Sequence, residues 1–177
     1  VFTSNGALTV TGSLNVSVLV VGGGGSGGTS KGGGGGAGGL VYDAVYAVTA
    51  NTYDMVIGDG GTGVTASGTL GNNGADTTFT INGGAMQFTA KGGGGGGDYA
   101  SNGVDGGSGG GGSYDRPNVE YSNGTSGQGN RGGRSNLPGY GAGGGGGGAG
   151  AVGSNAPAQH LGGPGGDGIQ STISGTA

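Results

Sequence analysis

Apolar and polar side chains alternate in short runs along the first half of the chain, with the two-residue period typical of β-strands. In residues 14–21, Leu14, Val16, Val18 and Val20 occupy alternate positions. Further β-branched or aromatic runs occur at residues 41–48 (VYDAVYAV), 53–57 (YDMVI), 77–82 and 85–90. No segment combines helical periodicity with capping residues. The pattern therefore predicts an all-β chain with essentially no α-helix.

Turn signals connect some of these runs. Asn5-Gly6 lies between residues 2–3 and 7–11, and Gly83-Gly84 lies between residues 77–82 and 85–90. Asn-Gly and Gly-Gly pairs favour tight hairpins. The tail, residues 169–173, has the composition of one more short strand. Together these elements predict an antiparallel, jelly-roll-like β-sandwich of about seven strands.

Glycine runs interrupt and follow the strands. They lie at residues 22–25, 32–36, 92–97, 109–112 and 143–148, and 58 of the 177 residues are glycine. Such runs carry no side chains for a core, and ordering each residue costs ~1–2 kcal/mol. Collagen is excluded, because its glycine recurs at every third position with abundant proline, whereas this chain has consecutive glycines and only 4 prolines. The runs are therefore either disordered linkers or segments ordered by backbone hydrogen bonds alone.

A bundle of polyglycine II helices is the ordered alternative. These left-handed rods have three residues per turn and rise ~3.1 Å per residue, and neighbours without side chains can approach closely enough to exchange backbone hydrogen bonds. Each such bond returns only ~0.5–1.5 kcal/mol, so we expect several rods anchored on the sandwich rather than an isolated pair. Tyr, Arg, Asp and aliphatic residues between the runs also argue against a monotonous linker. The predicted bundle-forming positions include Gly22, Gly24, Gly34, Gly94, Gly96, Gly110, Gly145 and Gly147.

The first glycine segment lies between two strands, which predicts one interleaved domain over residues 1–177. Residues 1–21 and 40–90 are expected to form mainly the sandwich. The rods and their loops are expected at residues 22–39 and 91–168, and a final strand or tail at residues 169–177.

Charge and composition exclude several function classes. The chain has 5 basic and 9 acidic residues, a net charge of −4, and no cysteine. It lacks the clustered Lys and Arg of nucleic-acid-binding proteins and any apolar stretch near the ~20 residues of a membrane span. Thiolate metal sites and disulfides are excluded as well. We therefore expect neither a nucleic-acid partner nor a membrane span.

Motifs for catalysis or cofactors are weak. Gly22, Gly24 and Gly27 match G-x-G-x-x-G after a strand, but the following glycines cannot form the helix that a dinucleotide site needs. Residues 162–170 match one calcium-binding nonapeptide, whose β-roll needs tandem copies, so a role of Asp167 in calcium binding stays open. His160 is the only histidine, and no nucleophile–base pair stands out. The sequence predicts no enzyme, no cofactor and no metal.

Tyrosine and arginine concentrate between the late glycine runs, in residues 98–105, 113–123 and 130–140. These side chains are enriched at recognition hot spots, and loops on rigid scaffolds commonly carry binding. They could equally cap the ends of the rods. Contact with a receptor or another subunit is assigned to Tyr99, Tyr114, Arg116, Tyr121, Arg131, Arg134 and Tyr140.

Residues 2–6, 18–28, 32–40, 56–61, 143–150 and 162–169 together resemble the glycine-rich domain of bacteriophage tail-fibre and other virion proteins. The glycine-rich part is also similar to the distal adhesins of T-even-like phages, whose polyglycine II rods present loops to a bacterial receptor. The resemblance implies a non-enzymatic structural or adhesive domain of an extracellular or virion-surface appendage. Its partners would be other copies of itself, other virion or appendage proteins, or a bacterial surface receptor. A self-assembling filament or capsid-decoration subunit and an ice-binding protein remain alternatives.

Overall fold

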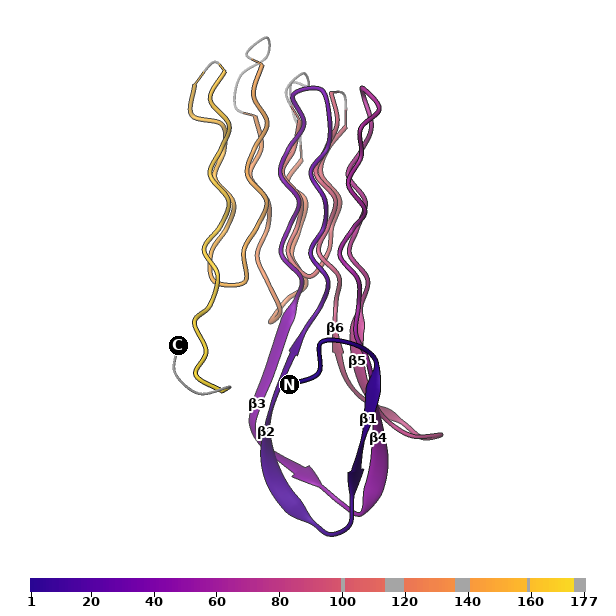
Figure 1. Ribbon diagram of the computed structural model, residues 1–177. Coiled ribbons are helices and arrows are strands. Elements are labelled where there is room, and N and C mark those ends of the chain that lie inside the picture. The colour runs from indigo at the N-terminus through magenta and orange to yellow at the C-terminus, as the bar shows by residue number, and fades with distance from the viewer. Residues whose placement is uncertain (100, 114–119, 136–140, 159, 174–177) are drawn as a thin grey trace.

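The computed structural model describes residues 1–99, 101–113, 120–135, 141–158 and 160–173. A small β-sandwich stands at one end, and long extended rods rise from it side by side to the other end (Figure 1). No helix occurs in these described residues. The strands and the rods belong to one continuous body, since several strands run straight into rods (Figure 1).

The described residues form six strands in two antiparallel sheets. One sheet has the order β1-β4-β5-β6 and the other pairs β2 with β3. This arrangement confirms the predicted all-β, sandwich-like fold. The strands are β1 (Gly6–Val10), β2 (Leu14–Val21), β3 (Leu40–Val48), β4 (Asn51–Val56), β5 (Thr77–Ile81) and β6 (Met86–Ala90).

The hydrophobic core lies where β2 and β3 cover β5 and β6. Tyr53 and Phe79 stack with ring centroids 5.1 Å apart, and Tyr46 meets Phe88 edge-on at 4.8 Å. The Tyr53 hydroxyl accepts the N–H of Thr49 at 2.9 Å and donates to its carbonyl at 3.2 Å. The buried hydroxyl is thereby satisfied, and it fixes the turn between β3 and β4.

The predicted hairpin at Asn5-Gly6 is wrong, whereas the predicted turn at Gly83-Gly84 is confirmed. Residues 2–5 form no strand, and β1 pairs with β4 instead. The Asn5 side-chain oxygen accepts the N–H of Ile57 at 2.8 Å, so this residue anchors the sheet edge instead of turning a hairpin. Residues 2–3 are too few to hold a ladder, whereas every residue of β1 pairs with a residue of β4. Gly83 has a φ of 66° and joins β5 to β6.

The predicted final strand is also wrong within residues 169–173, none of which is in a strand. The preceding rod bonds to residues 141–148, through the amides of Gly163 and Gly166. This rod lies at the side of the bundle, so Ile169 reaches the outer face of β2 beside Leu19 and Val21. Residues 174–177 lie outside the described residues.

Rods continue from the strands. Residues 22–29 extend β2, residues 32–39 lead into β3, and residues 91–98 follow β6 (Figure 1). Residues 57–64 and 69–76 form a similar pair between β4 and β5. The later rods have no strand of their own and comprise residues 102–107, 108–113, 120–125, 129–135, 141–148, 151–158 and 161–168.

Hydrogen bonds between rods repeat every three residues. In residues 32–39, every third amide donates to residues 91–98, through the pairs Gly33–Gly97, Gly36–Gly94 and Gly39–Lys91 at 2.9, 2.8 and 2.7 Å. The next amide of each triplet donates to residues 141–148, through Gly34–Gly144 and Ala37–Gly147 at 3.1 and 2.9 Å. Three residues per turn is the geometry of polyproline II, so these segments are polyglycine II rods.

Residues 57–76 correct the predicted boundary between sandwich and bundle. Residues 40–90 are predicted to form mainly the sandwich, yet Gly61, Gly71 and Gly74 donate their amides to the carbonyls of Gly24, Gly96 and Gly93 at 2.8, 2.8 and 2.9 Å. This stretch lacks a glycine run, because only its inward positions need to be glycine. It therefore forms two outer rods of the bundle.

Gln128 joins the later rods to the sandwich. Its side-chain oxygen accepts the N–H of Lys91 at 2.8 Å, and its side-chain nitrogen donates to the carbonyl of Thr89 at 2.9 Å. Its own carbonyl accepts the N–H of Leu40 at 2.9 Å. One turn residue thus bonds the starts of β3 and of the 91–98 rod, which couples the bundle to both sheets.

Candidate functional site

The rod at residues 92–97 lies in the interior of the bundle, and all of its residues are buried. Four of its amides donate to carbonyls of other rods, namely those of Gly23, Ser108, Ser26 and Gly111. The other two donate to side chains: Gly92 to Asp76 at 2.9 Å and Gly95 to Asn73 at 2.8 Å. Its carbonyls accept amides from Gly107, Gly74, Gly36, Val104, Gly71 and Gly33. Every backbone donor and acceptor of this buried segment is therefore satisfied, as a stable interior requires.

Most predicted bundle-forming glycines lie where no side chain fits. A Cβ at Gly22, Gly94, Gly96, Gly110, Gly145 or Gly147 would overlap a backbone carbonyl of a neighbouring rod. At Gly34 a Cβ would lie 3.1 Å from the nitrogen of Gly146, which is tight. Gly24 differs, because it is exposed and a Cβ there would lie 3.8 Å from the carbonyl oxygen of Gly36.

These glycines are required for space and not for a left-handed backbone. Among the described residues, glycines with positive φ are Gly68, Gly83, Gly127 and Gly141, and none of them is a predicted bundle position. The close approach of rods alone therefore excludes side chains from the interior. On the outer rods it leaves outward positions where side chains can be displayed.

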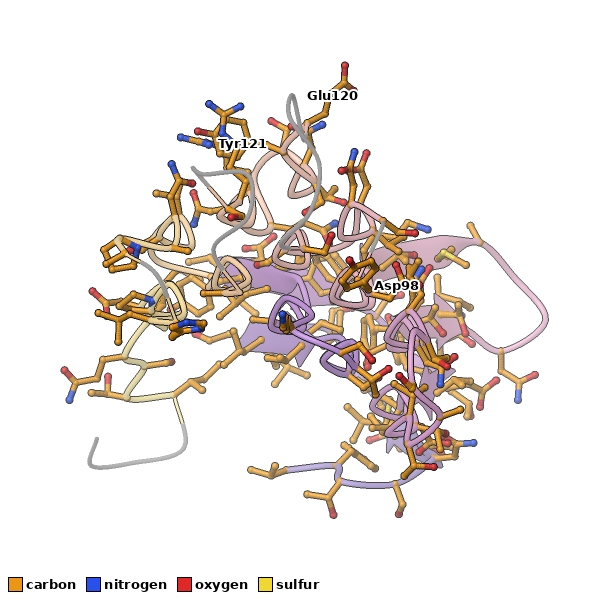
Figure 2. The ribbon with its side chains drawn as sticks, turned by 90° about the horizontal axis from the view of Figure 1, so that it is seen from above. Asp98, Glu120 and Tyr121 are labelled. Carbon is orange, nitrogen blue, oxygen red and sulfur yellow. The ribbon has the colours of Figure 1, made fainter. Side chains whose placement is uncertain are left out.

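Tyr121, Arg131 and Arg134 are brought together at the rim of the bundle. Tyr121 lies on the 120–125 rod, and both arginines lie on the 129–135 rod that follows it. The guanidinium carbons of Arg131 and Arg134 lie 3.7 and 4.6 Å from the centroid of the Tyr121 ring. In a view along the rods, Tyr121 stands at the outer edge of the molecule, and Glu120 points outward and away from it (Figure 2).

Asn155 completes this cluster from the 151–158 rod. Its side-chain nitrogen donates to the Tyr121 hydroxyl at 3.4 Å, and its oxygen accepts the N–H of Arg134 at 2.9 Å. Hydrogen bonds from Asn155 and Arg131, together with the charges of both arginines, lower the pKa of Tyr121 below its usual value, against the opposing effect of desolvation. The rim cluster, defined as Tyr121, Arg131, Arg134 and Asn155, thus favours negative charge at the phenol oxygen.

The sequence predicts these residues in loops, whereas Tyr121, Arg131 and Arg134 lie within rods. The signal that predicts this is the spacing R-G-G-R at residues 131–134. In a rod with three residues per turn, the two arginines face the same side. The glycines between them face inward, where a Cβ would overlap the carbonyls of Gly110 and Ser154.

Of the other predicted contact residues, the structure describes Tyr99 alone. Tyr99 follows the 91–98 rod and is 45% exposed. Tyr114, Arg116 and Tyr140 lie outside the described residues.

Turns at the end of the bundle far from the sandwich carry backbone strain. Ser30, Lys31 and His160 have φ values of 54°, 64° and 60°, an uncommon region for non-glycine residues. A Cβ at Gly141 would lie 2.8 Å from Nδ1 of His160 and 3.9 Å from Cδ of Lys31, so these two turns are adjacent. Strained residues of this kind often cluster at functional sites, and the sequence carries no signal for them beyond exposed turns.

Clefts occur where the sandwich meets the bundle and between the sheets. A polar cleft of about 370 Å³ is lined by Asp76, Lys91 and Asp105. Both carboxylates of this cleft have partners within the chain. Asp76 forms an ion pair with Lys91 at 2.7 Å, and Asp105 accepts the N–H of Asn123 at 2.6 Å. An apolar cleft of about 560 Å³ lies between β2 and the β1–β4–β5 side of the larger sheet.

The motif-like glycines serve the bundle. Residues 22–28 continue as a rod, and the 161–168 rod includes Asp167, whose carbonyl accepts amides from Gly150 and Ala151 at 2.9 and 3.2 Å. Within the described ranges, no three His, Cys, Asp or Glu side chains group as metal ligands would. A helix with the length and apolarity for crossing a membrane is likewise not found there.

Comparison with known proteins gives one family match. A family model described as a glycine-rich domain matches residues 3–177, so the match spans strands and rods together. No curated protein and no solved structure matches the chain. On the strength of a match over nearly its full length, the chain belongs to the glycine-rich domain family.

Proposed function

We propose that this chain is a non-enzymatic, rigid structural or adhesive domain of a phage fibre or a related extracellular appendage, which presents Tyr and Arg side chains to a receptor or a neighbouring subunit. The observation that carries the proposal is the fully hydrogen-bonded interior at residues 92–97. A body of this kind keeps its surface groups in fixed relation to one another without a large hydrophobic core.

Rigidity supports the proposed role because recognition improves when little order is lost on binding. The rods position side chains by their backbones, and each rod is bonded to several others. The rim cluster shows the consequence, since Tyr121, Arg131 and Asn155 come from three separate rods and still meet within contact distance. Tyr and Arg are also the residues that most often dominate binding energy in interfaces.

Adhesion to cells tests the proposal. The fluorescently labelled full chain is incubated with a panel of bacterial strains, and bound fluorescence is measured after washing. We expect a monodisperse monomer or small oligomer that saturates on at least one strain, and weaker binding by the Tyr121→Ala, Arg131→Ala double variant. A chain that stays folded and binds no strain above a denatured control would contradict the adhesive role.

A second candidate function is self-assembly, and the free edge of β2 favours it. Among the described residues, β2 pairs only with β3. Its sequence, LNVSVLVV, carries no charge, and Leu14 and Val21 are 51% and 49% exposed. The register with β3 shifts once, between Val16 and Val18, but β2 lacks the charged residues with which natural sheets often protect an edge. The occupant that we assign to this edge and to the adjacent apolar cleft is β2 of a second copy.

Sedimentation distinguishes the two candidates. Self-assembly predicts concentration-dependent oligomers or fibres in clean buffer, and the Leu14→Lys variant should be monomeric, because a charge at a strand edge opposes pairing. If the unmodified chain sediments as a monomer at all concentrations, the second candidate is excluded and the edge is left to other functions.

A further inference from the structure

We infer that the rim cluster binds an acidic polysaccharide, with Arg131 and Tyr121 as the contact residues. The inference rests on the proposed function in one respect, which is that the protein acts at a cell surface. It deepens that function by naming the chemical class of the receptor.

The backbone fixes the direction of both arginines. Gly132 and Gly133 are buried against the carbonyls of Gly110 and Ser154, so the rod cannot rotate about its axis. The carbonyls of Arg131 and Arg134 accept amides from Gly153 and Ala156 at 3.0 and 2.9 Å. Both side chains therefore leave the rod on the same side, one turn apart.

The Tyr121 ring is held between neighbouring rods in the same way. Ser122, the next residue, is buried, and its hydroxyl donates to the carbonyl of Gly110. Asn155 contacts the phenol oxygen at 3.4 Å. Preorganised side chains lose little conformational entropy when a ligand binds, which matters at a shallow site.

The two guanidinium groups concentrate positive charge in a chain of net charge −4. Both lie close to one ring centroid, at 3.7 and 4.6 Å, so they lie within the ~10 Å over which charges interact at 0.1 M salt. The Arg131 guanidinium lies over the Tyr121 ring, and its five N–H donors form a planar fork whose geometry suits a carboxylate or phosphate. The lowered pKa of Tyr121 agrees with a local preference for negative charge.

The surface around the cluster favours a glycan over a protein. The described residues next to it in sequence are small or polar, namely Glu120, Ser122, Asn130, Gly132, Gly133, Ser135, Ser154 and Ala156. Tyr121, Arg131 and Arg134 do not line the polar or the apolar cleft described above. Stable protein interfaces need a more apolar centre and roughly 1,200–2,000 Å² of buried area. A repeating acidic polymer suits a shallow site, because weak contacts along it add through effective concentration.

Affinity electrophoresis of the full chain tests the inference. The gels contain polygalacturonate, its methyl-esterified form, dextran sulfate, dextran or poly-glutamate. We expect retardation by polygalacturonate that is lost on esterification, absent with dextran, and abolished by high salt. Dextran sulfate shows whether sulfate can replace carboxylate.

Variants distinguish binding at the rim cluster from general electrostatic attraction to the polymer. Arg131→Ala should weaken retardation about tenfold or more, and Arg131→Lys should restore it only in part, because a lysine lacks the planar fork. Lys31→Ala removes the same charge elsewhere and should bind as the unmodified chain does. The inference is overturned if both alanine variants weaken binding equally, if poly-glutamate binds as well as polygalacturonate, or if no polymer binds.

The two proposals fail separately. Retardation by polygalacturonate without adhesion to any strain would keep the rim cluster as a glycan site and reject the adhesive role. Adhesion that Arg131→Ala leaves unchanged would keep the role and reject the site. Thermal unfolding of each variant checks that it is folded, and this cluster lies outside the fully bonded interior.

Discussion

The side-chain oxygen of Asn73 accepts the N–H of Gly95 at 2.8 Å. Gly95 lies in the buried 92–97 rod, and its N–H meets this side chain and not a backbone carbonyl. An exposed side chain on an outer rod therefore completes the hydrogen bonding of a residue that has no side chain itself. The same arrangement recurs one turn away, where Asp76 accepts the N–H of Gly92 at 2.9 Å.

Removing this acceptor should destabilise the bundle. Asn73→Ala leaves the amide of Gly95 without its partner, and we expect a loss of about 1–3 kcal/mol in the free energy of unfolding. Asn72→Ala is the matched control, because Asn72 is exposed on the same rod and its side chain bonds only to the carbonyl of Thr62. The control should change stability by about 0.5 kcal/mol or less. Denaturant unfolding measures both, and equal effects would contradict the role assigned to Asn73.

Acid should weaken the junction between sandwich and bundle. The hydrogen bond from Lys91, followed by that from Gly92, lowers the pKa of Asp76 below its usual value. A lowered folded-state pKa means that the unfolded chain binds the proton more tightly, so this stabilisation is present above the unfolded pKa. It is lost as the pH falls from the ordinary aspartate range through the folded value.

The Asp76→Asn variant checks this dependence. It keeps an oxygen for the amide of Gly92 and removes the titrating carboxylate. We expect it to be less stable than the unmodified chain near neutral pH, and the difference should shrink as the pH falls below about 4. Thermal midpoints measured across this range would contradict the account if the two proteins lost stability in parallel.

Interior glycines should not tolerate even a methyl group. A Cβ at Gly145 would overlap the carbonyl of Pro164 on the neighbouring rod. Gly145→Ala should cost about 1–3 kcal/mol or more, and Gly145→Val should disrupt this part of the bundle. Gly24→Ala is the control, because its Cβ has room. It should be neutral or stabilising by about 0.4–1 kcal/mol.

Much of the sandwich could be predicted from the alternation of apolar and polar residues, because a strand with one buried face has apolar side chains at every second position. Residues 14–21 and 41–48 correspond to β2 and β3 almost to the residue. The absence of a hairpin at Asn5-Gly6 could not be predicted from the local sequence. The side chain of Asn5 bonds instead to Ile57, which lies far along the chain. Local turn propensity cannot report such a distant contact.

Only the interior rods of the bundle could be predicted from the sequence. A rod surrounded by others needs glycine at every position, as in residues 92–97, and such runs are conspicuous. An outer rod needs glycine only at inward positions, which explains why Gly71 and Gly74, three residues apart, mark a rod that no run reveals. The same rule places Arg131 and Arg134 on one side. Triplet spacing of glycine is therefore the better sequence signal for this fold.

Titration of Tyr121 tests the geometry of the rim cluster. Asn155→Ala removes the hydrogen bond that contributes most to the lowered pKa, so the pKa of Tyr121 should rise toward its usual value near 10. NMR of ring-labelled tyrosine measures it, with the resonance assigned from Tyr121→Phe. An unchanged pKa would mean that Asn155 does not contact the phenol oxygen in solution.

Amide hydrogen exchange in the native protein tests the central claim most directly. If separate glycine segments bond laterally into a stiff body, the amides of Gly93, Gly95 and Gly97 should exchange as slowly as that of Phe79 in the sandwich core. The amide of exposed Gly63 should exchange quickly. Fast exchange throughout residues 92–97, beside a protected Phe79, would contradict the account and leave a small sandwich with unstructured glycine segments.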